Sequence, residues 1–171
     1  ICVKRHLDRV YSYSDVVLYM PYIPHARMDR VKSDEDVFTL KYFCEVINSL
    51  KFKVVHVRDA HSNVSLALLE NVVEEGIEWY VHNAIATSKA DALFFPDEGA
   101  MKRYSDHFTK PYAFGMKKRD WKTGKILGLD IINEENIKDK NVLIVDDICS
   151  RGGTFFYAAK ALKAAGAKSV S

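Results

Sequence analysis

The chain has 171 residues, of which 48% are hydrophobic and 28% are charged, an ordinary composition for one globular domain or two small ones. Its formal net charge of +2 provides no global field that would argue for nucleic acid as a partner, and no apolar run approaches the length of a membrane span. The cysteines, Cys2, Cys44 and Cys149, are scattered, which argues against a disulfide framework and favours a reducing cytoplasm.

The first part of the chain predicts helices and strands in alternation. The predicted helices cover residues 2–11, 37–50 and 64–71, and the predicted strands cover residues 16–20 and 53–57. Two prolines forbid regular structure just after the first strand, so residues 21–30 form a loop at its carboxyl end. Asp36 is placed to cap the second helix. Gly76 breaks the pattern, and we expect a domain boundary there.

The second part of the chain continues the alternation. Here the predicted helices cover residues 77–88, 100–108 and 154–165, and the predicted strands or extended segments cover residues 92–95, 112–116, 126–132 and 142–145. A charged, glycine-containing loop is expected over residues 117–125. This order predicts an α/β fold with largely parallel sheets and right-handed crossovers. The chain has no initiator Met and stops at what resembles the start of another strand, so we expect a longer protein.

Residues 141–154 carry the strongest local signal. Four aliphatic residues predict a buried strand, Asp146 and Asp147 follow it, and Gly152 and Gly153 precede a helix that Thr154 is expected to cap. Glycine-loop amides at a helix N-terminus suit an anion, while carboxylates suit sugar hydroxyls or a metal. Such units are also common as plain structure in α/β proteins. Charges at the edge of a core cost desolvation unless something uses them, which favours a sugar-phosphate site.

Polar clusters follow the predicted strands at five places, the last of them within residues 141–154. These clusters cover residues 25–30, 58–62, 97–99, 117–119 and 146–154. Ligands bind at the carboxyl ends of the strands in open α/β sheets. Parallel topology therefore predicts that the clusters within one half of the chain share a sheet edge and form a site.

The last cluster resembles the phosphoribosyl diphosphate (PRPP) loop of type I phosphoribosyltransferases and of ribose-phosphate diphosphokinases, Asp-Asp-x-x-Asp-Thr-Gly-Gly-Thr. The matching residues are Asp146, Asp147, Gly152, Gly153 and Thr154. The sequence departs from the pattern at Ser150, which can still donate to a phosphate, and at Arg151, which adds a cation.

The other clusters resemble motifs of the diphosphokinase family alone. Arg27 matches the arginine of Ala-Arg-Gln-Asp-Arg, but Met28 replaces the glutamine, so only a backbone or apolar contact remains there. His61 matches the histidine of Asp-x-His, and Asp97 matches the aspartate of Pro-Asp-x-Gly. Residues 117–119, Lys-Lys-Arg, resemble the Lys-Arg-Arg of a flexible catalytic loop.

The resemblance implies two phosphoribosyltransferase-like halves: residues 1–76 with the ATP-side loops, and residues 77–171 with the catalytic and PRPP loops. It implies transfer of diphosphate from Mg²⁺-ATP to the C1 hydroxyl of ribose 5-phosphate, giving PRPP and AMP, in a cytoplasmic homo-oligomer. The implied catalytic residues are Lys117 and Arg119. The implied ATP contacts are Arg27, Met28 and His61; the ribose-phosphate contacts are Asp146, Asp147, Ser150, Arg151, Gly152, Gly153 and Thr154; and the Mg²⁺ residues are His61 and Asp97.

Three alternatives remain open from the sequence. A type I phosphoribosyltransferase would use the same loop to consume PRPP. A non-catalytic member of the family would be a regulatory subunit. A third possibility keeps the chemistry but takes a larger acceptor such as ADP-ribose, for which the cation at Arg151 is the indication.

Overall fold

The computed structural model describes residues 1–11, 15–119 and 126–171; of Lys117–Arg119 and residues 126–127 it describes the backbone alone. The chain divides into two compact units, Ile1–Ile77 and Glu78–Ser171, and each is described by itself. The division lies next to Gly76, where the sequence predicts a boundary. The assignment of ATP-side and PRPP-loop roles to the two halves stays a prediction.

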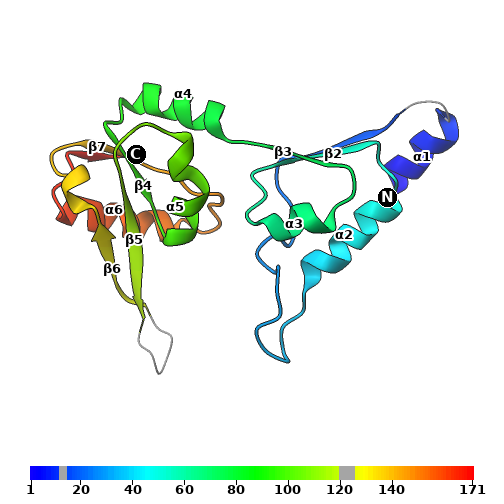
Figure 1. The fold of residues 1–171 in the computed structure, drawn as a ribbon, viewed down its shortest axis with the longest axis horizontal. Helices are drawn as coiled ribbons and strands as arrows, with labels where there is room; N and C mark the ends of the chain where they lie inside the picture. The colour runs from blue at the N-terminus through cyan, green and yellow to red at the C-terminus, as the bar shows by residue number, and fades with distance from the viewer. Residues whose placement is uncertain (12–14, 120–125) are drawn as a thin grey trace. The chain divides into compact units, whose positions relative to one another are not determined.

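The first unit contains a parallel sheet against which the helices at residues 39–49 and 63–68 pack (Figure 1). Its elements are α1 (Cys2–Val10), β1 (Val17–Met20), α2 (Thr39–Ser49), β2 (Val54–Arg58), α3 (Asn63–Leu68) and β3 (Val72–Glu75). The strands pair in parallel in the order β1-β2-β3. Alternate residues of β2, Val55 and Val57, are buried against Leu40 and Cys44 of α2. The loops that follow β1 and β2 therefore leave the sheet at one edge.

Two sequence-based expectations fail in this unit. Strand β3 was not predicted, because Val72 and Val73 stand between polar residues, and its formation depends on pairing with β2. Asp36 does not cap α2: its carboxylate accepts hydrogen bonds from the backbone N–H groups of Lys32 and Ser33 at 2.9 and 3.1 Å. The helix instead begins at Thr39.

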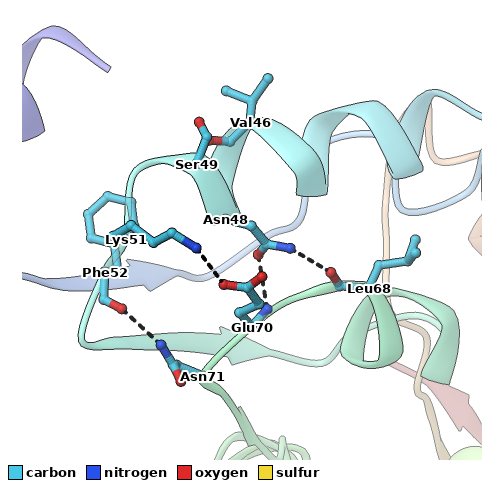
Figure 2. Close-up of polar contacts among 8 residues, drawn as sticks. All are labelled: Val46, Asn48, Ser49, Lys51, Phe52, Leu68, Glu70 and Asn71. Atoms are coloured by element: carbon cyan, nitrogen blue, oxygen red, sulfur yellow. Dashed lines mark hydrogen bonds and ion pairs between the residues drawn. The ribbon is translucent and has the colours of Figure 1, made fainter.

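An asparagine ties the end of α2 to the turn between α3 and β3 (Figure 2). The Asn48 side chain donates to the carbonyl of Leu68 and accepts from the backbone N–H of Glu70, both at 2.9 Å. Asn71 donates to the carbonyl of Phe52 at 3.2 Å. The Asn48 side chain thus pairs with backbone groups of the turn that have no partner in the β2–β3 ladder.

The second unit is a mixed sheet in which β4 lies between β5 and β7. Its elements are α4 (Glu78–Ser88), β4 (Ala92–Phe95), α5 (Glu98–Tyr104), η1 (Ser105–His107), β5 (Tyr112–Arg119), β6 (Ile126–Ile132), η2 (Glu134–Asn136), β7 (Asn141–Ile144), α6 (Gly153–Ala164) and β8 (Ser169–Val170). The order is β6-β5-β4-β7-β8, and all pairs except β5–β6 are parallel. The predicted α/β fold with mostly parallel, helix-flanked sheets is confirmed.

Burial explains why the centre of this sheet was predictable. Every residue of β4 is buried, as expected for a strand covered on both faces, and Phe94 packs with Val142 of β7 and Leu162 of α6. Strand β5 was expected to end at Met116, but it continues to Arg119 because β6 pairs with it in antiparallel register. No helix in the described part of the chain is long and apolar enough to cross a membrane.

Thr154 does not cap α6 as expected. The helix begins at Gly153, and its N-cap is Gly152, whose φ of 70° lies in the left-handed region that glycine adopts without strain. The glycine conformation ends the loop and starts the helix, so Thr154 lies in the first helical turn.

Candidate functional site

Carboxylates from two neighbouring parallel strands of the second unit form what we call the acidic edge: Asp97, Asp146 and Asp147. Strand β4 pairs in parallel with β7, so Asp97 after β4 and Asp146 after β7 leave the sheet at the same edge. Asp97 caps α5 by accepting a 3.0 Å hydrogen bond from the backbone N–H of Ala100. The backbone N–H of Asp147 donates to Asp146 Oδ1 at 3.0 Å.

The acidic edge shifts the titration of Asp146. Burial raises the pKa of its carboxyl to about 7, and the neighbouring Asp147, by hydrogen bonding and by charge, acts in the same direction. The charge of Asp97 adds a smaller effect. Asp146 can therefore bind or release a proton near neutral pH, which an ordinary aspartate cannot do.

Arg103 of α5 holds Asp147. Its guanidinium donates to Asp147 Oδ1 at 3.1 Å, and the Asp147 side chain is only 9% exposed. The guanidinium also lies over the ring of Tyr104, 5.1 Å from the ring centroid. Sequence reasoning missed Arg103, because it lies 44 residues from its partner and within a helix. The ion pair favours a charged Asp147 beside an Asp146 that titrates near neutrality.

The glycine loop, residues 150–153, leads from the acidic edge to the N-terminus of α6. Ser150, Arg151 and Thr154 are exposed there. Backbone N–H groups at the start of a helix carry partial positive charge and bind anions. A few residues after the carboxylates the chain thus offers backbone N–H groups that suit an anion, and binding of a sugar phosphate there stays a prediction.

The predicted catalytic residues, Lys117 and Arg119, lie at the carboxyl end of β5. Because β5 pairs in parallel with β4, this end belongs to the same sheet edge as Asp97. Their side chains lie outside the described residues, so their contacts with the acidic edge stay a prediction.

An open pocket of about 350 Å³ follows β1 in the first unit, and we call it the cationic pocket. Its lining combines cations (Arg27, Arg30, Lys32), acids (Glu35, Asp36) and the less polar residues Met28, Val37 and Thr39. The predicted ATP contacts Arg27 and Met28 thus share one pocket. Their neighbours Arg30 and Thr39 were not among the predicted contacts.

Asp29 is buried and holds Arg30, which lines the cationic pocket. Its buried carboxylate accepts two hydrogen bonds from Arg30, from Nε at 2.8 Å and from Nη2 at 2.9 Å. The Arg30 hydrogen bonds are the main cause that lowers the pKa of Asp29 to about 2, and the charge of His61 also contributes. The Arg30 side chain stays 64% exposed, so it is held in place and remains available to solvent.

His61, the third predicted ATP contact, lies in the loop after β2 and outside the lining of the cationic pocket. Its φ is 53° and that of Asp59 is 50°, left-handed values that cost energy for residues other than glycine. The backbone N–H of His61 donates to the Asp59 carbonyl at 2.8 Å. Lys51 and Lys89, in other loops, have φ values in the same range, so this conformation does not by itself assign a role to the loop, and the ATP contact of His61 stays a prediction.

The predicted magnesium residues fit the ion unequally. His61 belongs to the first unit and Asp97 to the second, so a site that joins them stays a prediction. Among the described residues, no group of three or more histidine, cysteine or acidic side chains could hold a metal. Mg²⁺ prefers oxygen and is often bound by one or two carboxylates plus substrate phosphates. The carboxylates of the acidic edge fit that chemistry, and the His61 imidazole does not.

Comparison with known proteins identifies relatives. Residues 68–171 match the family model described as phosphoribosyl transferase domain. The ribose-phosphate pyrophosphokinase of Saccharolobus solfataricus is 27% identical over 157 residues, covering 89% of this chain and 54% of that protein. Ribose-phosphate pyrophosphokinase 2 of Archaeoglobus fulgidus is 32% identical over 161 residues, covering 89% of this chain and 55% of that protein.

A solved structure shares the fold. The phosphoribosylpyrophosphate synthetase of Mycobacterium smegmatis superimposes with a TM-score of 0.76 at 20% identity, over 98% of this chain and 56% of that one. The chain thus spans about half the length of the curated relatives that it matches.

Proposed function

Because this chain belongs to the phosphoribosyl transferase domain family, we propose that it forms the core of a ribose-phosphate diphosphokinase. The reaction transfers the β,γ-diphosphate of ATP to the C1 hydroxyl of ribose 5-phosphate, giving PRPP and AMP. The observation that carries the proposal is the acidic edge beside the N-terminus of α6, since it offers carboxylates to a sugar and an anion site to its phosphate. The relatives named above support the choice of reaction.

The cationic pocket separates this proposal from the type I phosphoribosyltransferase alternative. An enzyme that only consumes PRPP needs the acidic edge and the glycine loop, but not a second polyphosphate site. In this chain Arg27, Arg30 and Lys32 gather in a pocket of the other unit, which supports binding of ATP there.

The acidic edge provides the acceptor chemistry in this proposal. Asp147, held by Arg103, binds the ribose hydroxyls, and Ser150 to Thr154 bind the 5′-phosphate. Asp146, with a pKa of about 7, accepts the proton of the C1 hydroxyl. The hydroxyl oxygen then bonds to the β-phosphorus, the bond from that phosphorus to the α,β-bridging oxygen breaks, and AMP leaves with that oxygen.

Charge neutralisation completes the proposal. Bound Mg²⁺ would neutralise the polyphosphate, and the carboxylate of Asp97 is the residue we assign to it. Lys117 and Arg119 stabilise the negative charge that develops on the transferred group. On the ATP side, Arg27 and His61 hold the polyphosphate and Met28 contacts the nucleoside.

Release of AMP tests the function directly. Incubation of the full-length protein with Mg²⁺, ATP and ribose 5-phosphate should yield AMP and PRPP in equal amounts, and Lys117→Ala should lower kcat by about 100-fold. Lys168→Ala, a control at the opposite edge of the same sheet, should keep full activity. PRPP-dependent transfer to a nucleobase without AMP formation would instead identify a phosphoribosyltransferase, and no turnover of either kind would identify a regulatory subunit.

A larger acceptor is the second candidate, and the exposed Arg151 in the glycine loop favours it. A guanidinium can bind a second phosphate beyond the 5′-phosphate, as in ADP-ribose. AMP release with ADP-ribose in place of ribose 5-phosphate decides between the acceptors. The proposal also includes a cytoplasmic homo-oligomer; the free thiols of Cys2, Cys44 and Cys149 agree with a reducing compartment.

A further inference from the structure

The cationic pocket combines two kinds of lining that suit a nucleotide. Arg27, Arg30 and Lys32 supply positive charge against the acids Glu35 and Asp36, while Met28 and Val37 supply apolar surface. The carboxylate of Asp36 is already engaged by the backbone N–H groups of Lys32 and Ser33, so it competes less for a ligand. Charge suits a polyphosphate, and the apolar patch suits a flat ring.

Met28 is exposed but anchored, which distinguishes it from an ordinary surface methionine. Its backbone N–H donates to the carbonyl of His25 at 2.8 Å, and its carbonyl accepts from the N–H of Leu40 at 3.4 Å. Its Sδ accepts from the hydroxyl of Thr39, at 3.0 Å. The side chain is 53% exposed even so. Contacts with both the loop and the start of α2 thus fix a thioether in the pocket wall.

We propose that Met28 determines nucleotide specificity: it is an apolar platform that contacts the face of a purine base and does not read its edge, so the pocket accepts adenine and guanine nucleoside triphosphates alike. The proposal rests on the diphosphokinase function given above. A thioether has no hydrogen-bond donor and is only a weak acceptor, and the Met28 Sδ already accepts a hydrogen bond from the Thr39 hydroxyl. Sites that hydrogen-bond a polar group discriminate far more strongly than apolar surfaces do.

Replacement of Met28 by an edge-reading side chain tests the inference. Glutamine can pair with N6 and N7 of adenine, and such a contact is worth about 5- to 150-fold in discrimination between bases. We therefore expect the wild-type protein to bind the β,γ-imido analogues of ATP and GTP with dissociation constants within about 3-fold of each other, and Met28→Gln to favour the ATP analogue by about 10-fold. Calorimetric titration measures both constants.

Two control variants distinguish hydrogen bonding to the edge of the base from apolar contact with its face. Met28→Leu keeps an apolar surface and should keep the equal affinities. Val46→Gln places the same amide on an exposed position of α2 outside the pocket lining and should also leave them equal. A wild-type preference for the ATP analogue of more than about 10-fold, or a Met28→Gln variant with unchanged selectivity, would overturn the inference.

Turnover distinguishes this inference from the proposed function. Equal binding of both analogues without AMP or GMP release in the presence of ribose 5-phosphate would sustain the role of Met28 and refute the diphosphokinase. Release of AMP from ATP by a wild-type protein that binds the ATP analogue more than about 10-fold more tightly than the GTP analogue would sustain the diphosphokinase and refute the role of Met28.

Discussion

Asp29 and Asp146 each follow a strand that pairs in parallel with its neighbour, one in each unit, and their pKa values shift in opposite directions. The pKa of Asp29 falls to about 2 because Arg30 donates two hydrogen bonds to it, whereas burial and the neighbouring Asp147 raise that of Asp146 to about 7. The first unit thus uses an acid to hold an exposed cation. The second gathers more carboxylates than Arg103 can neutralise. The exposed guanidinium of Arg30 suits a phosphate, whereas the carboxylates of the acidic edge suit sugar hydroxyls or a metal.

The largest effect should come from removing the titrating carboxyl of the acidic edge. Asp146→Asn should lower kcat/KM for AMP release by about 100-fold, because an amide cannot accept the hydroxyl proton. The same variant should be more stable than the wild type at pH 8. A raised pKa stabilises the folded state below the ordinary value of 3.8, and this stability is lost as the pH rises through about 7.

Thermal unfolding between pH 4 and pH 8, without added divalent cations, measures the predicted difference in stability between Asp146→Asn and the wild type. The melting temperature of Asp146→Asn should exceed that of the wild type at pH 8, and the difference should shrink toward pH 4. A variant that is active, or less stable than the wild type at pH 8, would show that Asp146 is an ordinary structural residue.

The position of the acidic edge depends on a close backbone approach at Gly115 of β5. A Cβ at this residue would lie 2.7 Å from the carbonyl oxygen of Pro96, directly before Asp97, and 2.8 Å from a methyl of Leu129. Gly115→Ala should therefore lower the free energy of unfolding by about 2 kcal/mol and displace Asp97. Gly128→Ala in β6, where no described atom lies within 4 Å of the added Cβ, is the matched control. Equal denaturant midpoints for the two variants would contradict the close approach.

How much of this was predictable depends on whether a residue acts through local or distant contacts. Strands β4 and β6 have the predicted bounds because their apolar runs are explicit in the sequence. Strand β3 was missed because two valines before two glutamates carry no strand signal until β2 pairs with them. Acids at strand ends were predictable as a kind of site, whereas the partnership of Arg103 with Asp147 was not.

The predicted helix caps were wrong for a related reason. Asp36 and Thr154 are good capping residue types at plausible positions. The carboxylate of Asp36 is used within its own loop, and the left-handed Gly152 starts α6 one residue before Thr154. Residue type predicts a capping tendency, but the backbone path of the loop decides where the helix begins.

In the first unit, Asp29→Asn should loosen Arg30 and lower the stability by about 1.5 kcal/mol at pH 7, a modest value because the guanidinium is mostly exposed. The lowered pKa gives the sign of the pH dependence: the contribution of Asp29 is present above pH 4 and is lost as the pH falls through about 2. Urea unfolding at pH 7 and pH 3 should therefore show a smaller difference from the wild type at the lower pH. KM for ATP should rise about 3-fold with kcat unchanged.

Asp34→Asn is the control for this prediction, because Asp34 is an exposed carboxylate in the same loop. Its effect should stay within about 0.5 kcal/mol. If both variants lose equal stability, the loss reflects net charge and not the support that Asp29 gives to Arg30.

The smallest effect should come from the tie at the end of α2 (Figure 2). Asn48→Ala removes both 2.9 Å bonds to the turn before β3, and we expect a loss of about 1 kcal/mol in urea unfolding because the turn groups are partly exposed to water. The Val55 amide, which donates to the carbonyl of Asn71, should exchange its hydrogen faster. Ser49→Ala, which removes only a bond to the Val46 carbonyl within α2, should leave that exchange unchanged. Equal exchange in both variants would mean that pairing with β2 orders β3 without the hydrogen bonds of Asn48.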